Sequence, residues 1–303
     1  MTAFFEAMFF SPKWYHYVVM TLLFPLSVLY GAIMFIRRVM SSKKYFSIPI
    51  VSIGNLQVGG SGKTPFVIAL ASRYEDVTII SRGYGRQSTG LVEVSYKGKV
   101  VVNVKQSGDE PMLMAQSLAH ASVIVSEDRT IAIELAMREG AKLIILDDGF
   151  NRVDIEKYEI LLEPEWTPNT LPFPAGPQRE FTFTKRYANI VAKEKKLFNR
   201  VVEYENLSDK MLLVTAISNP SRLDSYLPKG VVGKVYLEDH AYFNENALKG
   251  QMLSYGAKSL LVTQKDAVKM QEFKLPLSLM KLKLEVDETL FMEIDRYIKN
   301  FKE

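Results

Sequence analysis

Beyond residue 45 the chain alternates short apolar runs with amphipathic segments. The apolar runs, rich in Val, Ile and Leu, lie near residues 47–53, 77–81, 122–125 and 143–146. Helical patterns cover 63–73 and 129–138, and a Val-rich hairpin is predicted from 91 to 104. A further helix is predicted to begin at Pro111, with Asp109 as its cap. Strands that alternate with helices form βαβ units, so we predict an α/β fold with a parallel sheet flanked by helices.

The last third of the chain repeats this alternation on a smaller scale. Strands are predicted near 211–216, 231–236 and 259–263, and a closing helix at 287–301. The polar stretch 193–210 is the best linker candidate. We therefore divide the chain into an N-terminal helix with a basic flank (1–44), a main domain (45–205) and a smaller C-terminal α/β domain (206–303).

The N-terminal segment has the length and composition of a membrane helix. No Asp, Glu, Lys or Arg occurs between Lys13 and Arg37, and a bilayer core requires about 20 apolar residues. Aromatic residues cluster at the start of the segment and basic residues follow its end, namely Trp14, Tyr15, Tyr17 and Arg37, Arg38, Lys43, Lys44. This asymmetry predicts that the downstream domains face the cytoplasm.

Two other interpretations of this segment stay open. Pro25, Ser27 and Gly31 interrupt a simple spanning helix, so a kinked segment embedded in one leaflet fits the same sequence. A helix buried in a soluble core would also be apolar. A secretory signal fits less well, because the apolar stretch is long and lacks a small-residue cleavage site.

Composition narrows the function classes. The 303 residues are 48% hydrophobic, which supplies ample core for two domains. The absence of cysteine excludes disulfides, thiolate zinc sites and cysteine nucleophiles. A formal net charge of +4 is too weak to indicate nucleic acid, so no nucleic acid partner is predicted. The same charge is compatible with an anionic membrane surface or a phosphorylated substrate.

The most informative motif is a glycine-rich loop between a predicted strand and a predicted helix. Its nucleotide-binding residues are Gln57, Val58, Gly59, Gly60, Ser61, Gly62, Lys63 and Thr64. The glycines let backbone N–H groups turn toward one anion, Lys63 reaches the β- and γ-phosphates, and Thr64 ligates Mg²⁺. Gln57 departs from the strict pattern, which has glycine there. A glycine-rich turn without a ligand is the alternative.

Four polar motifs follow elsewhere in the chain. They are Asp147-Asp148 at the end of an apolar strand, Ser81–Arg86, Gly108-Asp109-Glu110-Pro111, and Glu238-Asp239-His240. Two carboxylates after a strand are typical of Mg²⁺ binding in nucleotide enzymes, although a simple turn gives the same pattern. The other three also have structural alternatives: a flexible basic loop, a helix cap and a solvated histidine. The segment Pro172–Glu180 predicts a rigid loop.

In this order the motifs resemble those of one family, the tetraacyldisaccharide 4'-kinases of lipid A biosynthesis. The resemblance rests on Gly54-Asn55, Gly59–Pro65, Ser81–Arg86, Gly108–Pro111, Asp147–Phe150, Pro174–Pro177 with Arg179-Glu180, Asp239-His240, and Thr263 with Lys265-Asp266. It covers nearly the whole chain, including the membrane-associated N-terminal helix. The implied fold is a P-loop NTPase-like domain with a smaller C-terminal α/β domain.

The resemblance implies an enzyme at the cytoplasmic face of the inner membrane. Its implied reaction uses ATP and Mg²⁺ to phosphorylate the 4'-hydroxyl of an acylated disaccharide 1-phosphate lipid, forming lipid IV-A. The implied catalytic residues are Asp109, His240, Lys63 and Asp148, and the implied metal ligands are Thr64, Asp147 and Glu110. Substrate contacts are implied for Asn55, Arg86, Asn151 and Arg179. No obligate protein partner is inferred.

Two other classes stay open from the sequence. A membrane-anchored regulatory or transport-coupled P-loop ATPase would hydrolyse ATP without a lipid acceptor. A non-catalytic adaptor with a vestigial nucleotide loop is disfavoured by the intact Lys63, Thr64 and Asp147.

Overall fold

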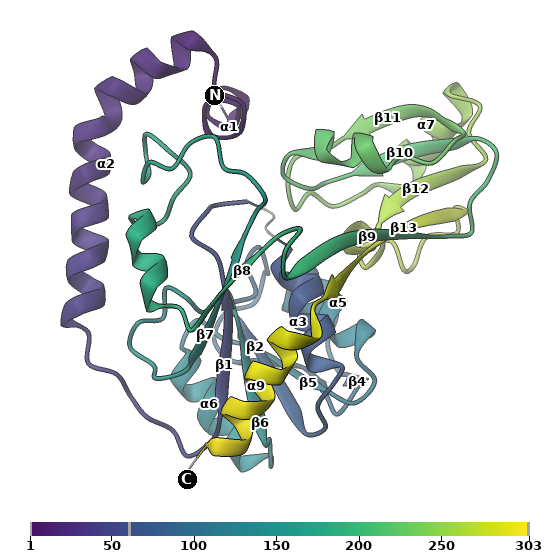
Figure 1. Ribbon diagram of the computed structural model, residues 1–303. Coiled ribbons are helices and arrows are strands. Elements are labelled where there is room, and N and C mark those ends of the chain that lie inside the picture. The colour runs from purple at the N-terminus through teal and green to yellow at the C-terminus, as the bar shows by residue number, and fades with distance from the viewer. Residues whose placement is uncertain (1, 60–61, 302–303) are drawn as a thin grey trace.

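The computed structural model describes residues 2–59 and 62–301. The described residues form two β-sheets, each covered by helices, and an N-terminal arm of two helices (Figure 1). Gly60 and Ser61, two residues of the predicted phosphate loop, lie outside the described residues.

The first sheet has eight strands in the order β4-β3-β5-β2-β6-β1-β7-β8. Their bounds are β1 (Ile50–Gly54), β2 (Val77–Ser81), β3 (Val92–Tyr96), β4 (Lys99–Val100), β5 (Ser122–Val125), β6 (Leu143–Asp147), β7 (Tyr158–Glu163) and β8 (Ile190–Lys193). The six strands from β5 to β8 along this order are parallel, and β3 and β4 form an antiparallel hairpin at the edge. The parallel sheet and the hairpin predicted from the sequence are confirmed.

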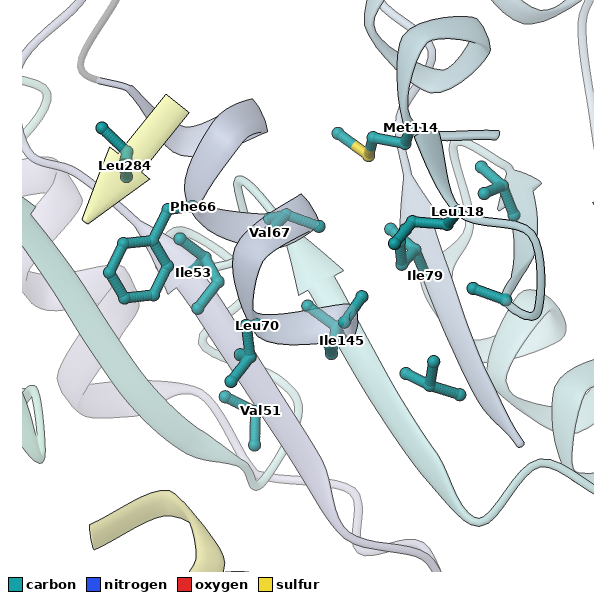
Figure 2. Close-up of a cluster of buried hydrophobic side chains, with 14 of the residues drawn as sticks. Val51, Ile53, Phe66, Val67, Leu70, Ile79, Met114, Leu118, Ile145 and Leu284 are labelled. Carbon is teal, nitrogen blue, oxygen red and sulfur yellow. The ribbon is translucent and has the colours of Figure 1, made fainter. Parts of the chain in front are cut away.

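Helices cover both faces of the first sheet because its central strands are largely apolar and are buried at every position. They are α3 (Lys63–Ala71), α4 (Val104–Ser107) and α5 (Asp109–Ser117) on one face, and α6 (Arg129–Arg138) on the other. Figure 2 shows Phe66, Val67 and Leu70 of α3 packed among side chains of β1, β2 and β6. This packing fixes α3, and with it the phosphate loop, to the carboxyl end of β1.

Helix α5 begins two residues earlier than the sequence predicts. Its N-cap is Gly108, at φ 86°, and Asp109 already lies in the first turn. Asp109 was expected to cap the helix, and this expectation is wrong: the residue makes no capping hydrogen bond, because its carboxylate binds groups of the second sheet.

The second sheet has five strands in the order β11-β10-β12-β13-β9. Their bounds are β9 (Phe198–Glu205), β10 (Met211–Thr215), β11 (Val231–Tyr236), β12 (Ser259–Thr263) and β13 (Leu277–Val286). Helices α7 (Glu245–Ser254) and α8 (Gln264–Ala267) and the short 3-10 helix η2 (Pro220–Tyr226) connect them. The stretch interpreted as a linker instead contains β9, an edge strand paired antiparallel with β13, whose residues after Phe198 are half-buried or exposed.

The last helix returns to the first sheet. In α9 (Glu288–Asn300), Phe291 and Ile294 join the core beside α3, and the Tyr297 hydroxyl lies 3.3 Å from both the N and the O of Ile50. The chain therefore passes from the first sheet to the second and back. The domain boundary at residue 205 stays a prediction. The two sheets do not divide at that residue, because β9 before it belongs to the second sheet and α9 after it packs on the first.

The N-terminal arm consists of α1 (Thr2–Phe10) and α2 (Trp14–Met40). In the described part of the chain, α2 is the one helix long and apolar enough to cross a membrane. Leu22 is 75% exposed and Leu29 58% exposed, so the helix is not buried in a soluble core. Figure 1 shows α2 along one side of the molecule, away from the second sheet.

Candidate active site

The predicted site motifs meet at the carboxyl edge of the first sheet, where β1, β2 and β6 end. This edge is the usual ligand site of an open parallel sheet. The phosphate loop follows β1, the Ser81–Arg86 loop follows β2, and the paired carboxylates end β6. The second sheet contributes His240 and Lys269 to the same region.

The phosphate loop is held in place by backbone hydrogen bonds to the proline-rich segment. Val58 N–H donates to Pro177 O over 2.9 Å, and Arg179 N–H donates to Leu56 O over 2.7 Å. Gly59 and Gly62 have φ values of 94° and 84°, which glycine adopts without strain. Thr64 lies in the first turn of α3, half-buried, and the Gln57 side chain accepts from Thr167 over 3.3 Å.

Lys63 is held by two neighbours of the loop. Its Nζ lies 3.0 Å from Asn55 Oδ1 and 3.5 Å from Asp148 Oδ1. Asn55 is 1% exposed and its amide nitrogen donates to Gln57 O. Asn55 therefore orients the lysine, a role that the sequence-based assignment to substrate binding did not include.

The two carboxylates after β6 differ in charge state. Asp148 accepts from Arg179 over 2.8 Å at both oxygens; burial opposes ionisation, but Lys63 and Arg179 hold the pKa of Asp148 below its usual range. Asp147 is buried, and burial together with the charges of Glu110 and Asp148 raises its pKa to about 7. Ser81 donates to Asp147 Oδ2 over 2.9 Å.

The residues fit a magnesium ion supplied with a nucleotide. Asp147 Oδ1 is buried and has no hydrogen-bond partner among residues 2–59 and 62–301, which leaves an oxygen available to a cation or to its bound water. Within the described ranges, no three His or acidic side chains are grouped closely enough to hold a metal by themselves. Such a site suits an ion bound through one or two protein oxygens and substrate phosphates.

The second sheet supplies partners for the first turn of α5. His240 Nδ1 and Lys269 Nζ each lie 3.1 Å from Asp109 Oδ2, and Lys265 Nζ lies 3.3 Å from Glu110 Oε1. Burial raises the pKa of Asp109, but the His240 hydrogen bond and the charge of Lys269 outweigh it and hold the pKa below its ordinary value. Asp109 is therefore an ionised carboxylate.

Two residues predicted to contact substrate make contacts within the protein. The Arg86 guanidinium pairs with Glu127 Oε1 over 2.6 Å and donates to Gly90 O. The Asn151 carbonyl accepts from Arg37 over 2.9 Å, while its Oδ1 is buried without a partner. Their substrate roles stay predictions.

A cavity of about 1200 Å³ opens beside the phosphate loop. Its apolar wall comes from α1, with Phe5, Phe9 and Phe10, and from the loop that carries Trp166 and Phe173. Asn55, Gln57, Val58 and Gly59 line it on the nucleotide side, and Arg200, Arg222, Glu238 and Asp239 line it on the side of the second sheet and its loops. Sequence reasoning missed these α1 aromatics, although the run Phe4–Phe10 contains one charged residue, Glu6.

Comparisons with known proteins decide the family. The family model described as Tetraacyldisaccharide-1-P 4'-kinase matches residues 19–299. The chain belongs to the tetraacyldisaccharide 4'-kinase family. It is 46% identical over 300 residues to a tetraacyldisaccharide 4'-kinase of Helicobacter pylori strain J99, covering 98% of this chain and 96% of the relative. It is 43% identical over 306 residues to the Aliarcobacter butzleri enzyme, with 98% and 97% covered.

A solved structure resembles the chain over most of its length. It is the "apo" form of LpxK from Aquifex aeolicus in complex with ATP, with a TM-score of 0.77, 27% identity, and coverage of 92% of this chain and 99% of that one. The predicted family, fold class and kinase activity on a hydroxyl group of a lipid A precursor are confirmed. A regulatory or transport-coupled ATPase is not favoured.

Proposed function

We propose that this protein transfers the γ-phosphoryl group of ATP to the 4'-hydroxyl of a tetraacyldisaccharide 1-phosphate at the carboxyl edge of the first sheet, forming lipid IV-A. The observation that carries the site assignment is the position of Asp109. This ionised carboxylate from α5 is held by His240 of the other domain, at the sheet edge where the phosphate loop also lies. ATP as the phosphoryl donor is supported by the ATP-bound relative.

The nucleotide would bind along the phosphate loop. Backbone N–H groups of the loop and Lys63 offset the charge of the β- and γ-phosphates, because phosphoryl transfer depends mainly on positioning and charge neutralisation. Thr64 and Asp147, with Glu110 nearby, would hold Mg²⁺, which would supply positive charge to offset the charge of the phosphates. Asp148 keeps Lys63 and Arg179 at the same edge.

Asp109 would accept the proton of the sugar hydroxyl. Its Oδ2 is occupied by His240 and Lys269, and among the described residues no group hydrogen-bonds its Oδ1. A hydroxyl is a poor nucleophile at neutral pH, so a carboxylate oxygen within hydrogen-bond reach assists its attack. The free Oδ1 suits this role.

The cavity beside the phosphate loop suits the acylated disaccharide. Its apolar wall on α1 and on the loop with Trp166 can take hydrocarbon, while the opposite wall is polar and carries charges of both signs, with Arg200 and Arg222 beside Glu194, Glu238 and Asp239. Acyl chains leave a bilayer at a cost of about 0.8 kcal/mol per CH₂. An enzyme that docks at the membrane avoids most of that cost.

We further propose that α2 holds the protein at the cytoplasmic face of the inner membrane. The exposed apolar surface of α2 supports this, with Leu22, Leu29 and Ile33 among its exposed side chains. Replacement of Leu22 and Leu29 by Asp is expected to move the protein from the membrane fraction to the supernatant, with Leu253→Asp in the second domain as control. Membrane recovery equal to that of the native protein would contradict the proposal.

The catalytic proposal is tested with radiolabelled ATP and acylated disaccharide 1-phosphate. The native enzyme is expected to label the lipid, and Asp109→Ala to lose about 10²–10⁴-fold in kcat with ATP affinity retained. Release of label only as free phosphate would indicate an ATPase instead. A native rate in Asp109→Ala would remove the base assignment.

A further inference from the structure

Lys269 is a fully buried cation that the proposed mechanism leaves without a role. Its side chain is 0% exposed, and buried lysines are rare unless they are paired. It lies just beyond α8, three residues after Asp266, in the second domain. Its ammonium group is nevertheless 3.1 Å from Asp109 Oδ2, on α5 of the first domain.

The lysine contacts Asp109 and the residue that follows His240. Its Nζ donates to the carbonyl oxygen of Ala241 over 3.0 Å, directly after His240 in the chain. His240 itself has φ of 62°, an uncommon backbone conformation for a residue other than glycine. Its N–H donates to Ala216 O over 3.1 Å. Lys269 and Ala216 thus fix the segment that aims the imidazole at Asp109.

A second carboxylate anchors the lysine to the second sheet. Asp266 Oδ1 lies 3.7 Å from Lys269 Nζ and accepts from Ala216 N–H over 3.1 Å. Asp266 Oδ2 accepts 2.7 Å hydrogen bonds from the Thr215 and Thr263 hydroxyls, at the ends of β10 and β12. Asp266 is 0% exposed and fully hydrogen-bonded, so it is a fixed reference point for Lys269.

We propose that Lys269 is a positioning residue for the phosphoryl transfer: it holds Asp109 Oδ2 and the His240 segment together, so that Asp109 Oδ1 faces the substrate hydroxyl. This inference rests on the proposed role of Asp109 as the proton acceptor. If Lys269 only stabilised the second sheet, its contacts with Asp266 and the Ala241 carbonyl would be sufficient. Its additional contact with Asp109 on α5 is the one that can act on catalysis.

The test compares kcat and KM for native enzyme, Lys269→Met and a control, Lys258→Met. Lys258 is also a lysine of the second domain, but it is 63% exposed and pairs with Asp209. Misplaced catalytic groups cost about 10²-fold, so Lys269→Met is expected to lose about that factor in kcat. Its KM for ATP is expected to stay near native, whereas its melting temperature is expected to fall, because the buried Asp109 and Asp266 lose a cationic partner. Lys258→Met is expected to match native in kcat, in KM and in melting temperature.

A double-mutant cycle separates positioning from folding. Combined with Asp109→Asn, Lys269→Met is expected to cost less than about threefold in residual kcat, because residues that act as one unit are not additive. An equal loss in both backgrounds, or a native kcat in Lys269→Met, would overturn the inference. If Lys269→Met does not fold, Lys269→Gln, which keeps a donor for Ala241 O, replaces it in the cycle.

The same data distinguish this inference from the proposed function. Native turnover in Asp109→Asn alone would overturn the base assignment and this inference with it. Loss of turnover in Asp109→Asn together with native turnover in Lys269→Met would overturn the role of Lys269 alone.

Discussion

Arg38 and Glu180 are joined by two hydrogen bonds of 2.8 Å, one from Nε and one from Nη2 of the guanidinium. Arg38 lies near the end of α2, and Glu180 ends the proline-rich loop. Arg38 also donates to Phe150 O over 2.9 Å and lies over the Phe150 ring. The apolar helix is thereby fixed to the segment that carries Asp147 and Asp148.

Arg38→Met is expected to destabilise the protein strongly. The Glu180 side chain is 0% exposed, and removing its partner leaves a buried charge unpaired, which costs about 3–5 kcal/mol. Denaturant unfolding in detergent measures the loss. Arg37→Met is the matched control, since Arg37 is exposed and its guanidinium donates to the Asn151 carbonyl; it is expected to cost about 1 kcal/mol or less. Equal losses in the two variants would contradict this view of the pair.

Asn55→Ala is expected to weaken ATP binding and to leave the lipid acceptor largely unaffected. The variant removes the 3.0 Å hydrogen bond that orients Lys63, and a bond to a charged group contributes about 1.5–3 kcal/mol, or at least tenfold in an equilibrium constant. Steady-state kinetics with each substrate varied in turn measure the effect. A higher KM for the acceptor with KM for ATP unchanged would instead support a direct substrate contact.

The stability of the metal-free protein is expected to fall as pH rises from about 4 to about 7 because of Asp147. Burial and the neighbouring carboxylates raise its pKa from 3.8 to about 7 in the folded state. Over this window the unfolded chain loses the proton while the folded protein keeps it, so unfolding becomes more favourable. Asp147→Asn removes this contribution.

The measurement is the unfolding free energy of native protein and Asp147→Asn in chelator across that pH window. The native protein is expected to lose stability relative to the variant as pH rises. Asp209→Asn controls for substitution of an exposed carboxylate. A pH-independent difference between native protein and Asp147→Asn would show that the folded state does not hold this proton. Mg²⁺ is expected to offset the loss, because a ligand that binds the ionised carboxylate releases its proton.

Gly54→Ala is expected to destabilise the site, whereas Gly250→Ala is expected to stabilise the protein. A Cβ on Gly54 would lie 2.4 Å from the Phe150 Cβ, so the segment after β6 would have to shift at a cost of about 1–3 kcal/mol. A Cβ on Gly250, inside α7, meets nothing within 4 Å, and alanine there gains about 0.5–1 kcal/mol. Thermal unfolding of both variants checks the two signs. An unchanged melting temperature in Gly54→Ala would show that Phe150 shifts to make room for the added Cβ at little cost.

The elements that could be predicted from the sequence are those defined by residues close together in the chain. Strands such as β2 and β6 are short runs rich in Val, Ile and Leu, and the glycines, Lys63 and Thr64 of the phosphate loop lie close together in the chain. The polar strand β9 was missed because it is an edge strand, half exposed, whose partner β13 lies far along the chain.

Contacts between distant residues could not be predicted from local pattern. Nothing in the spacing of Lys269 indicates that it reaches Asp109, and the basic flank of α2 was interpreted through membrane topology alone. The Arg38 guanidinium instead binds Glu180. Asp109 was expected at a helix cap because acidic residues commonly occupy that position. Its partners His240 and Lys269 lie far along the chain, in segments that follow β11 and α8.

The return of α9 to the first sheet has a consequence for biosynthesis. Phe291 and Ile294 complete the core beside α3, so this part of the core stays incomplete until α9 has been synthesised. By then α2 has long been synthesised. The core of the nucleotide-binding half is therefore completed by one of the last elements in the order of synthesis, well after the apolar arm is available.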